Sequence, residues 1–185
     1  MILPITAYGD PLLRKVAKPI DKKYNGLSEL IENMFQTMHQ ADGVGLAAPQ
    51  VGHSIRLFVI DASAAASDEE PELADFKKVF INPTIISTSG EPWAFEEGCL
   101  SLPNIREDVM RPEEVEIHYF DENWVEKTEK YDSYPARIIQ HEYDHLDGKL
   151  FIDHISPLRK RLLKSKLMAI TKGKSSASYK MNPVK

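Results

Sequence analysis

The chain has 185 residues and a formal net charge of −5, and 42% of its residues are hydrophobic and 28% charged. These proportions are those of an ordinary globular protein, so they exclude a collagen-like chain and argue against intrinsic disorder. The length predicts a single domain with enough buried surface for a core. No segment has the roughly 20 apolar residues that a membrane-spanning helix needs, and we expect neither a membrane nor DNA as a partner.

The N-terminal segment carries no recognisable targeting signal. MILPITAYGDPLLRK lacks the basic and apolar regions of a secretory signal, and it also lacks the Arg- and Ser-rich bias of a transit peptide. We therefore expect a cytoplasmic location. The sequence contains a single cysteine, Cys99, so no disulfide can form within the chain. Any role of Cys99 is that of a thiol, a nucleophile or a metal ligand.

The first predicted element is a helix that begins at Leu27. Apolar residues recur at helical spacing up to Met38, and the pattern stops at Asp42 and Gly43, where glycine suits a C-terminal cap. The next segment, GVGLAAPQVG at 43–52, contains glycines and a proline, which argue against a regular element and let the backbone approach a ligand closely. We therefore expect a loop that forms one wall of a site.

A sheet is predicted for the middle of the chain. Runs rich in β-branched and aromatic residues indicate strands at 55–60, 79–87, 115–120 and 124–131. Residues 61–75 are rich in Ala, Ser, Asp and Glu, and we expect them to form a surface excursion without a chemical role.

Two more helices are predicted toward the C-terminus. One begins near Pro135, a residue suited to a first turn, and ends at Asp147 and Gly148. The other begins at the capping pair Ser156–Pro157 and runs to Gly173.

The helix near Pro135 carries the sequence QHEYDHLDG at 140–148, which contains the pattern His-Glu-x-x-His. His141 and His145 lie four residues apart, so their imidazoles project from one helix face and can bind the same metal ion. Glu142 lies one position round the helix, where it can act as a base and then as an acid on a water at the metal. The pattern therefore indicates a metal but not a substrate.

We therefore expect an α+β fold in which antiparallel or mixed sheets pack around a central metal-binding helix, followed by a C-terminal helix. Residues 1–173 are predicted to form a single catalytic domain, and residues 174–185 a flexible C-terminal tail.

The third ligand distinguishes the enzymes that use this pattern. Metzincin proteases place a third His where Phe151 stands here, and thermolysin-like proteases use a downstream Glu, although no Glu follows Glu142 in this chain. The remaining candidates are Asp153, His154, His39, His53, His118 and Cys99. A lone cysteine is most often a small buried apolar side chain. Cys99 is nevertheless the strongest candidate, because it lies in EGCLSLP, where Gly98 permits a tight backbone, and because thiolates bind divalent metals well. The other histidines are interpreted as structural or surface residues.

The C-terminal segment is basic. No acidic residue follows Asp153, whereas the segment contains Arg159, Lys160, Arg161, Lys164, Lys166, Lys172, Lys174, Lys180 and Lys185. Such a segment can bind an anionic partner such as RNA, although a charge run is more often a solvated helix face.

Three segments of the sequence resemble motifs of the peptide deformylase family. GVGLAAPQ at 43–50 resembles its G-x-G-L-A-A-x-Q, EGCLS at 97–101 is identical to its second motif, and QHEYDHLDG at 140–148 resembles its Q-H-E-x-D-H-L-x-G. The resemblance covers about residues 1–167 in order and spacing, and three motifs together are more specific than one. This chain deviates at 61–75 and in the tail.

The resemblance implies an enzyme that hydrolyses the N-terminal formyl group of N-formylmethionyl polypeptides and releases formate. The metal ligands of the family correspond to Cys99, His141 and His145, which leaves a fourth position for water. The family implies one divalent metal ion per chain, Fe²⁺ in the first place, with Zn²⁺, Ni²⁺ or Co²⁺ as substitutes. The donor set by itself would indicate zinc. Because formylated termini occur on new chains, the basic C-terminal helix is expected to contact the ribosome.

The resemblance also implies catalytic roles for three residues. Glu142 is the expected proton carrier. The Gln50 side-chain amide and the Leu100 backbone N–H are expected to stabilise the oxyanion that forms on the formyl group.

Four further residues are expected to bind the substrate. Val44 and Gly45 line the cleft, and the backbone at Gly45 and Gly98 pairs with the peptide as an added strand would. Arg106 either binds substrate carbonyls or pairs with a nearby carboxylate. Asp144 is interpreted as a hydrogen-bonding or salt-bridge residue of the helix, not as a ligand.

Two alternatives compete with this interpretation. The first is a metallopeptidase of the HExxH type that cleaves internal peptide bonds, against which the missing third His or Glu argues. The second is a structural metal-binding module without turnover. Structural zinc sites are normally closed by four protein ligands, and no fourth ligand is evident in the sequence.

Overall fold

The computed structural model describes residues 1–182 and 184. The helices are α1 (Leu27–Gln40), α2 (Ser133–Leu146), α3 (Pro157–Leu162) and α4 (Lys164–Thr171), with short 3-10 helices η1 (Pro11–Arg14), η2 (Ala48–Val51), η3 (Ser63–Ala65), η4 (Pro71–Asp75) and η5 (Phe151–Asp153). The strands are β1 (Ile5–Thr6), β2 (Gly45–Ala47), β3 (Leu57–Asp61), β4 (Lys77–Ser89), β5 (Trp93–Cys99), β6 (Leu102–Arg111), β7 (Glu114–Phe120), β8 (Glu126–Tyr131) and β9 (Met181–Asn182). Within these residues, no helix is both long and apolar enough to cross a membrane.

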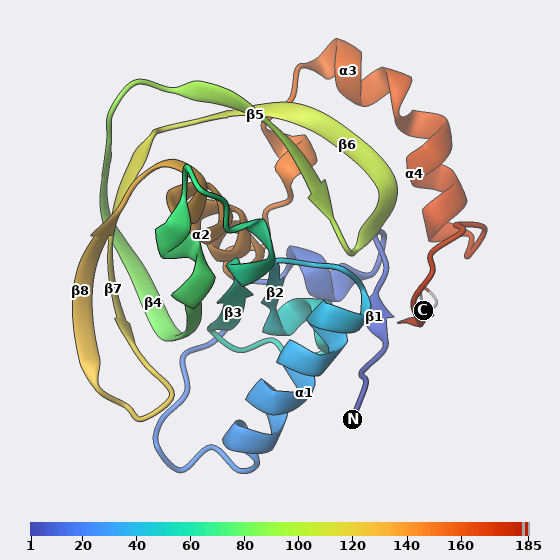
Figure 1. Cartoon of the computed structure of the whole chain (residues 1–185). Coiled ribbons are helices and arrows are strands. Elements are labelled where there is room, and N and C mark those ends of the chain that lie inside the picture. The colour runs from blue at the N-terminus through green and yellow to red at the C-terminus, as the bar shows by residue number, and fades with distance from the viewer. Residues whose placement is uncertain (183, 185) are drawn as a thin grey trace.

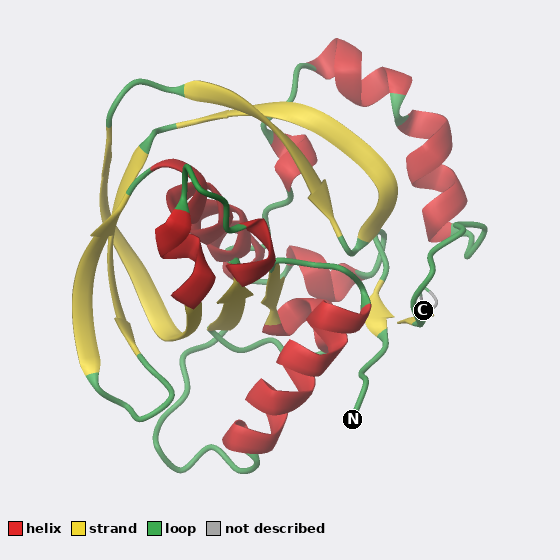
Figure 2. Cartoon of the chain, viewed as in Figure 1, coloured by secondary structure: helices red, strands yellow, loops and turns green. Residues whose placement is uncertain are grey.

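The strands surround helix α2. Five antiparallel strands form the main sheet in the order β2-β3-β4-β7-β8, while β5 and β6 form a separate hairpin, and β1 pairs in parallel with β9 (Figure 2). Helix α2 packs against β2, β3 and β7, and the β5–β6 hairpin arches over it (Figure 1). The predicted α+β fold with sheets around a central helix is thereby confirmed.

Strand β3 is buried on both faces, which explains why the sequence LFVI is entirely apolar. Successive side chains of a strand point to opposite faces. Phe58 and Ile60 pack in the cluster around α2, whereas Leu57 and Val59 pack in the cluster around α1. Because each fully buried side chain of this size contributes about 1.5–3 kcal/mol, β3 ties both helices to the sheet.

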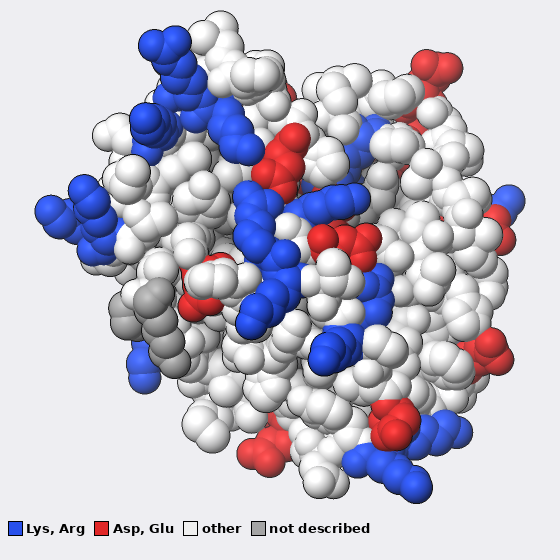
Figure 3. All heavy atoms as spheres, turned by 180° about the vertical axis from the view of Figure 1, so that it is seen from behind, with Lys and Arg blue, Asp and Glu red and all other residues white. Residues whose placement is uncertain are grey.

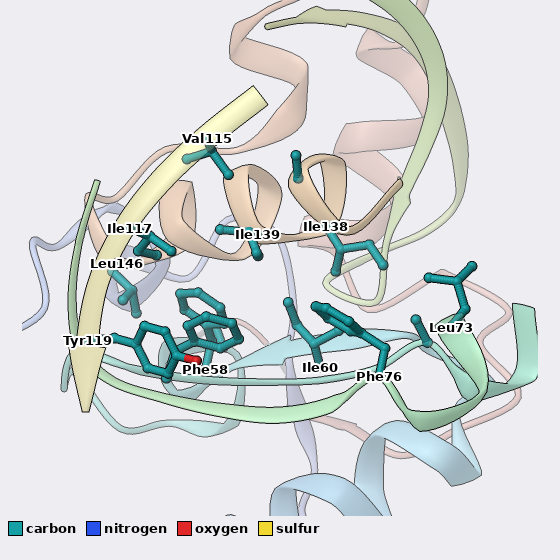
Figure 4. Packing of buried hydrophobic residues seen from close by; sticks show 14 of the residues in the cluster. Phe58, Ile60, Leu73, Phe76, Val115, Ile117, Tyr119, Ile138, Ile139 and Leu146 are labelled. Atoms are coloured by element: carbon teal, nitrogen blue, oxygen red, sulfur yellow. The ribbon is translucent and has the colours of Figure 1, made fainter. Parts of the chain in front are cut away.

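The apolar side of α2 fixes the helix on the sheet. Ile138, Ile139 and Leu146 point toward the sheet, to which Phe58 and Tyr119 belong, and all five are buried (Figure 4). This packing leaves Arg137, His141 and Asp144 of the helix directed toward the β5–β6 hairpin, where a site can form.

The β5–β6 hairpin is absent from the sequence prediction. Buried and exposed residues alternate along β6, but two of its buried positions hold Glu107 and Arg111. Charged residues at inward positions conceal the apolar alternation by which a strand is recognised. Glu107 pairs with Arg159 and Arg111 pairs with Glu97 and Asp144, so part of this charge pairing lies outside the hairpin, where no local pattern reveals it.

The prediction that residues 43–52 form no regular element is wrong. Gly45–Ala47 form strand β2, which pairs with β3, and Ala48–Val51 form η2. The small side chains of β2 have low strand propensity, but they let α2 approach the sheet edge closely.

Residues 61–75 are more firmly attached than a surface excursion. They contain η3 and η4, and Leu73 of η4 is fully buried beside Phe76 in the cluster around α2. One buried leucine thus anchors a segment that is otherwise mostly exposed.

The C-terminal end also differs from the prediction. The helix expected from Ser156–Pro157 to Gly173 is divided at Leu163 into α3 and α4. Residues 174–182, predicted as part of a flexible tail, return to the body of the molecule and end in β9, where Met181 packs in an apolar cluster. Residues 183 and 185 of that prediction lie outside the described residues.

Candidate metal centre

Two segments bring the three predicted ligands together. His141 and His145 lie one turn apart on α2, and Cys99 is the last residue of β5. The ligand atoms of the three side chains all lie within 4.8 Å of one another, and Cys99 Sγ is 3.4 Å from His145 Nε2. The β5–β6 hairpin thus places the Cys99 thiol, the third donor, next to the two histidines of α2.

This donor set fits a divalent metal ion. One thiol and two imidazoles suit Fe²⁺, Zn²⁺, Ni²⁺ and Co²⁺, and both histidines are buried. Burial lowers the pKa of His145 to about 3, so its imidazole is neutral, as a metal ligand must be. In the described part of the chain the group has three members, whereas a closed structural zinc site has four. The arrangement therefore argues against a purely structural role.

Glu97 orients one of the histidines. Its Oε1 lies 2.7 Å from His141 Nδ1, which directs the opposite ring nitrogen, Nε2, toward the site. Such a carboxylate partner fixes the ring orientation of a metal-binding histidine and raises its basicity. Glu97 lies inside the EGCLS motif, but no local pattern in the sequence predicts its contact with His141.

Two buried arginines hold Glu97 in its ionised form. Arg111 donates to both carboxylate oxygens, at 2.8 and 3.0 Å, and Arg137 donates to Oε2 at 2.9 Å. Burial acts to raise the pKa of Glu97, but the hydrogen bonds from His141 and Arg111 outweigh it and hold that pKa far below its usual value. Arg111 also donates to Asp144 at 2.8 Å, so Asp144 forms a salt bridge, as predicted.

Glu142 is buried at the end of the cavity next to strand β2. Burial raises the pKa of its carboxyl to about 7, where it can both accept and release a proton near neutral pH. Among the described residues, its Oε2 finds no hydrogen-bond partner and so remains free for a ligand. A Cβ on Gly45 would lie 2.4 Å from Glu142 Oε1, so only glycine at this position lets the carboxyl approach the strand.

Gln50 connects the first motif to the second. Its Oε1 accepts a hydrogen bond from the Ala47 backbone at 2.9 Å, and its Nε2 points to Cys99 Sγ at 3.4 Å and to Ser101 Oγ at 3.3 Å. The backbone contact fixes the orientation of the amide, which turns the NH₂ group toward Cys99 and Ser101. Leu100, the residue after Cys99, lies in the turn between β5 and β6.

A cavity of about 1040 Å³ opens beside these residues. All four predicted substrate-binding residues, Val44, Gly45, Gly98 and Arg106, line it together with Cys99, His141 and Glu142. Arg106 lies 3.8 Å from Glu96, and both side chains are largely exposed. The structure therefore contains the carboxylate pairing considered for Arg106 and also places the residue on the cavity wall.

The other candidate ligands lie outside the group of three. They have separate partners: His39 with Asp61 at 2.8 Å, His118 with Glu126 at 2.7 Å, His53 with Tyr24 at 3.4 Å, His154 with Asp144 at 2.7 Å, and Asp153 with Arg14 at 2.5 Å. Their interpretation as structural or surface residues agrees with these contacts.

The fold and the site together define the class of protein. A Cys/His/His donor set with two buried histidines, a carboxyl with a pKa near 7 and an adjoining cavity are the parts of a hydrolase that uses one metal ion.

Comparisons with known proteins identify the family. The family model for polypeptide deformylase matches residues 2–161. A peptide deformylase of Christiangramia forsetii is 58% identical over 187 residues, covering 98% of this chain and 95% of that protein, and one of Flavobacterium johnsoniae is 53% identical with the same coverage. The crystal structure of the Thermus thermophilus enzyme matches with a TM-score of 0.82 at 37% identity, covering 94% of this chain and 100% of that one. This chain belongs to the polypeptide deformylase family.

Family membership confirms the activity implied by the resemblance, the hydrolytic removal of the formyl group from new polypeptides. It does not favour the alternative of an HExxH metallopeptidase.

Proposed function

We propose that Cys99, His141 and His145 hold the catalytic metal ion with which this chain hydrolyses the formyl amide of N-formylmethionyl polypeptides. The observation that carries the proposal is the meeting of three distant motifs at one cavity, where Gln50 lies 3.4 Å from Cys99 and Glu142 lies beside them. When bound, the metal would supply Lewis-acid activation of a water molecule. We assign it as Fe²⁺, on the resemblance to the family, with Zn²⁺, Ni²⁺ or Co²⁺ as substitutes that the same donors accept.

Glu142 moves the proton in this proposal. Its carboxylate takes a proton from the attacking water and then delivers it to the amine nitrogen that leaves, so formate and a free N-terminus result. A pKa of about 7 suits both steps, since the group is neither strongly acidic nor strongly basic at neutral pH.

Gln50 and Leu100 stabilise the negative charge on the formyl oxygen. The Gln50 NH₂ group is already oriented by the Ala47 contact, so little reorganisation is needed when the charge develops. The Leu100 backbone N–H supplies the second donor.

The peptide binds along the cavity in this proposal. Val44 and Gly45 form one side and Gly98 the other, where the backbone groups of a strand edge can pair with an extended chain. Arg106 is exposed at the rim and binds substrate carbonyls in exchange for its long contact with Glu96.

The experiment compares formate release from a formyl-methionyl peptide by the wild type, by Glu142→Ala, and by Glu122→Ala, an exposed control. We expect Glu142→Ala to retain the metal and to lose turnover, and Glu122→Ala to behave as the wild type. Undiminished formate release by Glu142→Ala would refute its role, and internal cleavage of an unblocked peptide without formate would refute the proposed function.

We also propose a ribosome contact through the C-terminal helices, a cytoplasmic location and a single catalytic domain, to which residues 174–182 are joined through β9. Lys and Arg side chains gather at the upper left of Figure 3, where α3 and α4 lie, and an exposed surface there contains Lys164, Lys172, Leu162 and Met168. If this surface binds ribosomal RNA, a Lys164→Glu/Lys172→Glu variant should cosediment less with ribosomes at low salt than a Lys22→Glu/Lys23→Glu control. Equal cosedimentation would refute the contact.

A further inference from the structure

The C-terminal segment after α4 returns to the metal centre. It leaves α4 at Gly173 and ends in β9, where Met181 pairs with Ile5 of β1 and the Lys180 carbonyl accepts a hydrogen bond from the Ile5 backbone at 2.9 Å. The segment is therefore fixed at both ends, by the helix and by the strand pair. Between these two anchors it passes the turn that joins β5 to β6.

One side chain of this segment contacts that turn directly. The Tyr179 hydroxyl donates a hydrogen bond to the Leu100 carbonyl at 2.8 Å. Leu100 follows the ligand Cys99, and its own N–H is the proposed donor to the developing oxyanion. The hydrogen bond therefore holds the residue that carries the second oxyanion donor.

Two other segments hold the same turn. The Ser101 carbonyl accepts a hydrogen bond from the Tyr8 backbone at 2.8 Å, and Ser101 Oγ lies 3.3 Å from Gln50 Nε2. The Leu100 carbonyl, by contrast, is held by Tyr179 of the C-terminal segment. The Leu100–Ser101 peptide group, directly after the proposed N–H donor, is thus held by a residue far from the family motifs in sequence.

The same segment forms a wall of the substrate cavity. Residues 176–179 line it, as do Val44 and Gly45. The Asn104 side-chain amide donates to the Ser176 carbonyl at 3.2 Å, which ties the segment to β6. A peptide in the cavity would therefore lie against the C-terminal segment as well as against the motif residues.

We infer that Tyr179 is a positioning residue of the active site, which through its hydroxyl fixes the carbonyl of Leu100, the residue whose N–H is the proposed donor, and bounds the substrate cavity with its ring. This inference rests on the proposed function. Because oxyanion donors act only when they are correctly placed, loss of the hydroxyl should lower kcat while the ring still forms the wall and KM is retained.

The test compares Tyr179→Phe with Tyr24→Phe, which removes the hydroxyl that lies 3.4 Å from His53 on the α1 side of the molecule. We expect kcat for a formyl-methionyl tripeptide to fall about 3- to 10-fold in Tyr179→Phe, with KM and metal content close to those of the wild type. The lost neutral hydrogen bond should lower Tm by only a few degrees. Tyr24→Phe should leave kcat unchanged. Tyr179→Ala should in addition raise KM, because the wall is lost.

The results separate this inference from the proposed function. If the wild type releases no formate, the proposed function fails. If the wild type is active and kcat of Tyr179→Phe equals it, the positioning role is refuted. It is also refuted if kcat falls only in proportion to a loss of folded protein, which Tm and circular dichroism measure on the same samples.

Discussion

At the scale of single residues, the side-chain amide of Gln50 makes two kinds of contact, one through its oxygen and one through its NH₂ group. Its oxygen accepts from Ala47 and its NH₂ group faces Cys99 and Ser101, so the acceptor end orients the donor end. A freely rotating amide would spend part of its time with the oxygen turned toward the thiolate, which would repel a developing oxyanion. The backbone contact removes this orientation.

Replacing Gln50 should therefore damage catalysis more than metal binding. Loss of one oxyanion donor costs about 2.7–4 kcal/mol, so we expect kcat of Gln50→Ala to fall about 100- to 1000-fold, with the metal content unchanged. The control is Ser101→Ala, which removes the other partner of the amide and leaves the donor in place. Steady-state kinetics and metal analysis measure both variants, and a Gln50→Ala enzyme with wild-type kcat would contradict the proposed role.

The role of Glu97 could not be predicted from its own sequence motif. The motifs predicted Cys99, His141 and His145, because their types and spacing express metal chemistry directly. Glu97 acts through His141, and it is kept ionised by Arg111 of strand β6 and Arg137 of helix α2. Arginine is rarely buried unless it is paired, so the burial of Arg111 and Arg137 could not be predicted without knowing that both contact Glu97.

At the scale of elements, the end of α2 depends on Gly148. This residue has φ +70°, and a Cβ there would lie 2.4 Å from the Arg14 carbonyl of η1, which packs against the helix end. Glycine thus permits both the left-handed conformation and the close approach of η1.

The Gly148→Ala variant should be less stable than Gly173→Ala. Both glycines have positive φ, but a Cβ on Gly173, at the end of α4, meets no atom within 4 Å among the described residues. The left-handed conformation alone costs about 1–2 kcal/mol for alanine, so Gly173→Ala reports that cost and Gly148→Ala adds the clash with backbone. Urea unfolding measures the difference, and equal free energies of unfolding would contradict this account.

The salt bridge between Arg14 of η1 and Asp153 of η5 predicts how the stability of the fold depends on pH. Burial acts to raise the pKa of Asp153, but the hydrogen bond and charge of Arg14 and the Leu150 N–H outweigh it and lower that pKa below 3.8. A carboxyl with a lower pKa in the folded state stabilises the fold above its ordinary pKa, and this contribution disappears as the pH falls through the folded value.

We therefore expect Asp153→Asn to be less stable than the wild type at about pH 7. This difference in stability should shrink below about pH 4. Thermal unfolding at a series of pH values measures it, with the exposed Asp68→Asn as control. A difference that grew on acidification would show that the sign is wrong.

At the scale of the whole molecule, the α+β class and the central helix could be predicted, because the helical spacing of α1 and α2 and the strand composition of β3, β4 and β7 are local signals. The β5–β6 hairpin could not be predicted, since its inward positions include charged residues. The return of the C-terminal segment also has no local signal, because β9 has two residues and forms only against β1. The enclosure of the cavity follows from these two long-range features.

We propose above all that the three motifs at 43–50, 97–101 and 140–148 form one metal-dependent deformylase site. The most direct measurement is formate release from a formyl-methionyl peptide by the purified protein before chelation, after removal of the metal, and after anaerobic addition of Fe²⁺. We expect activity to disappear with the metal and to return with Fe²⁺ at about one ion per chain. Formate release at the full rate by the metal-free protein would contradict the account.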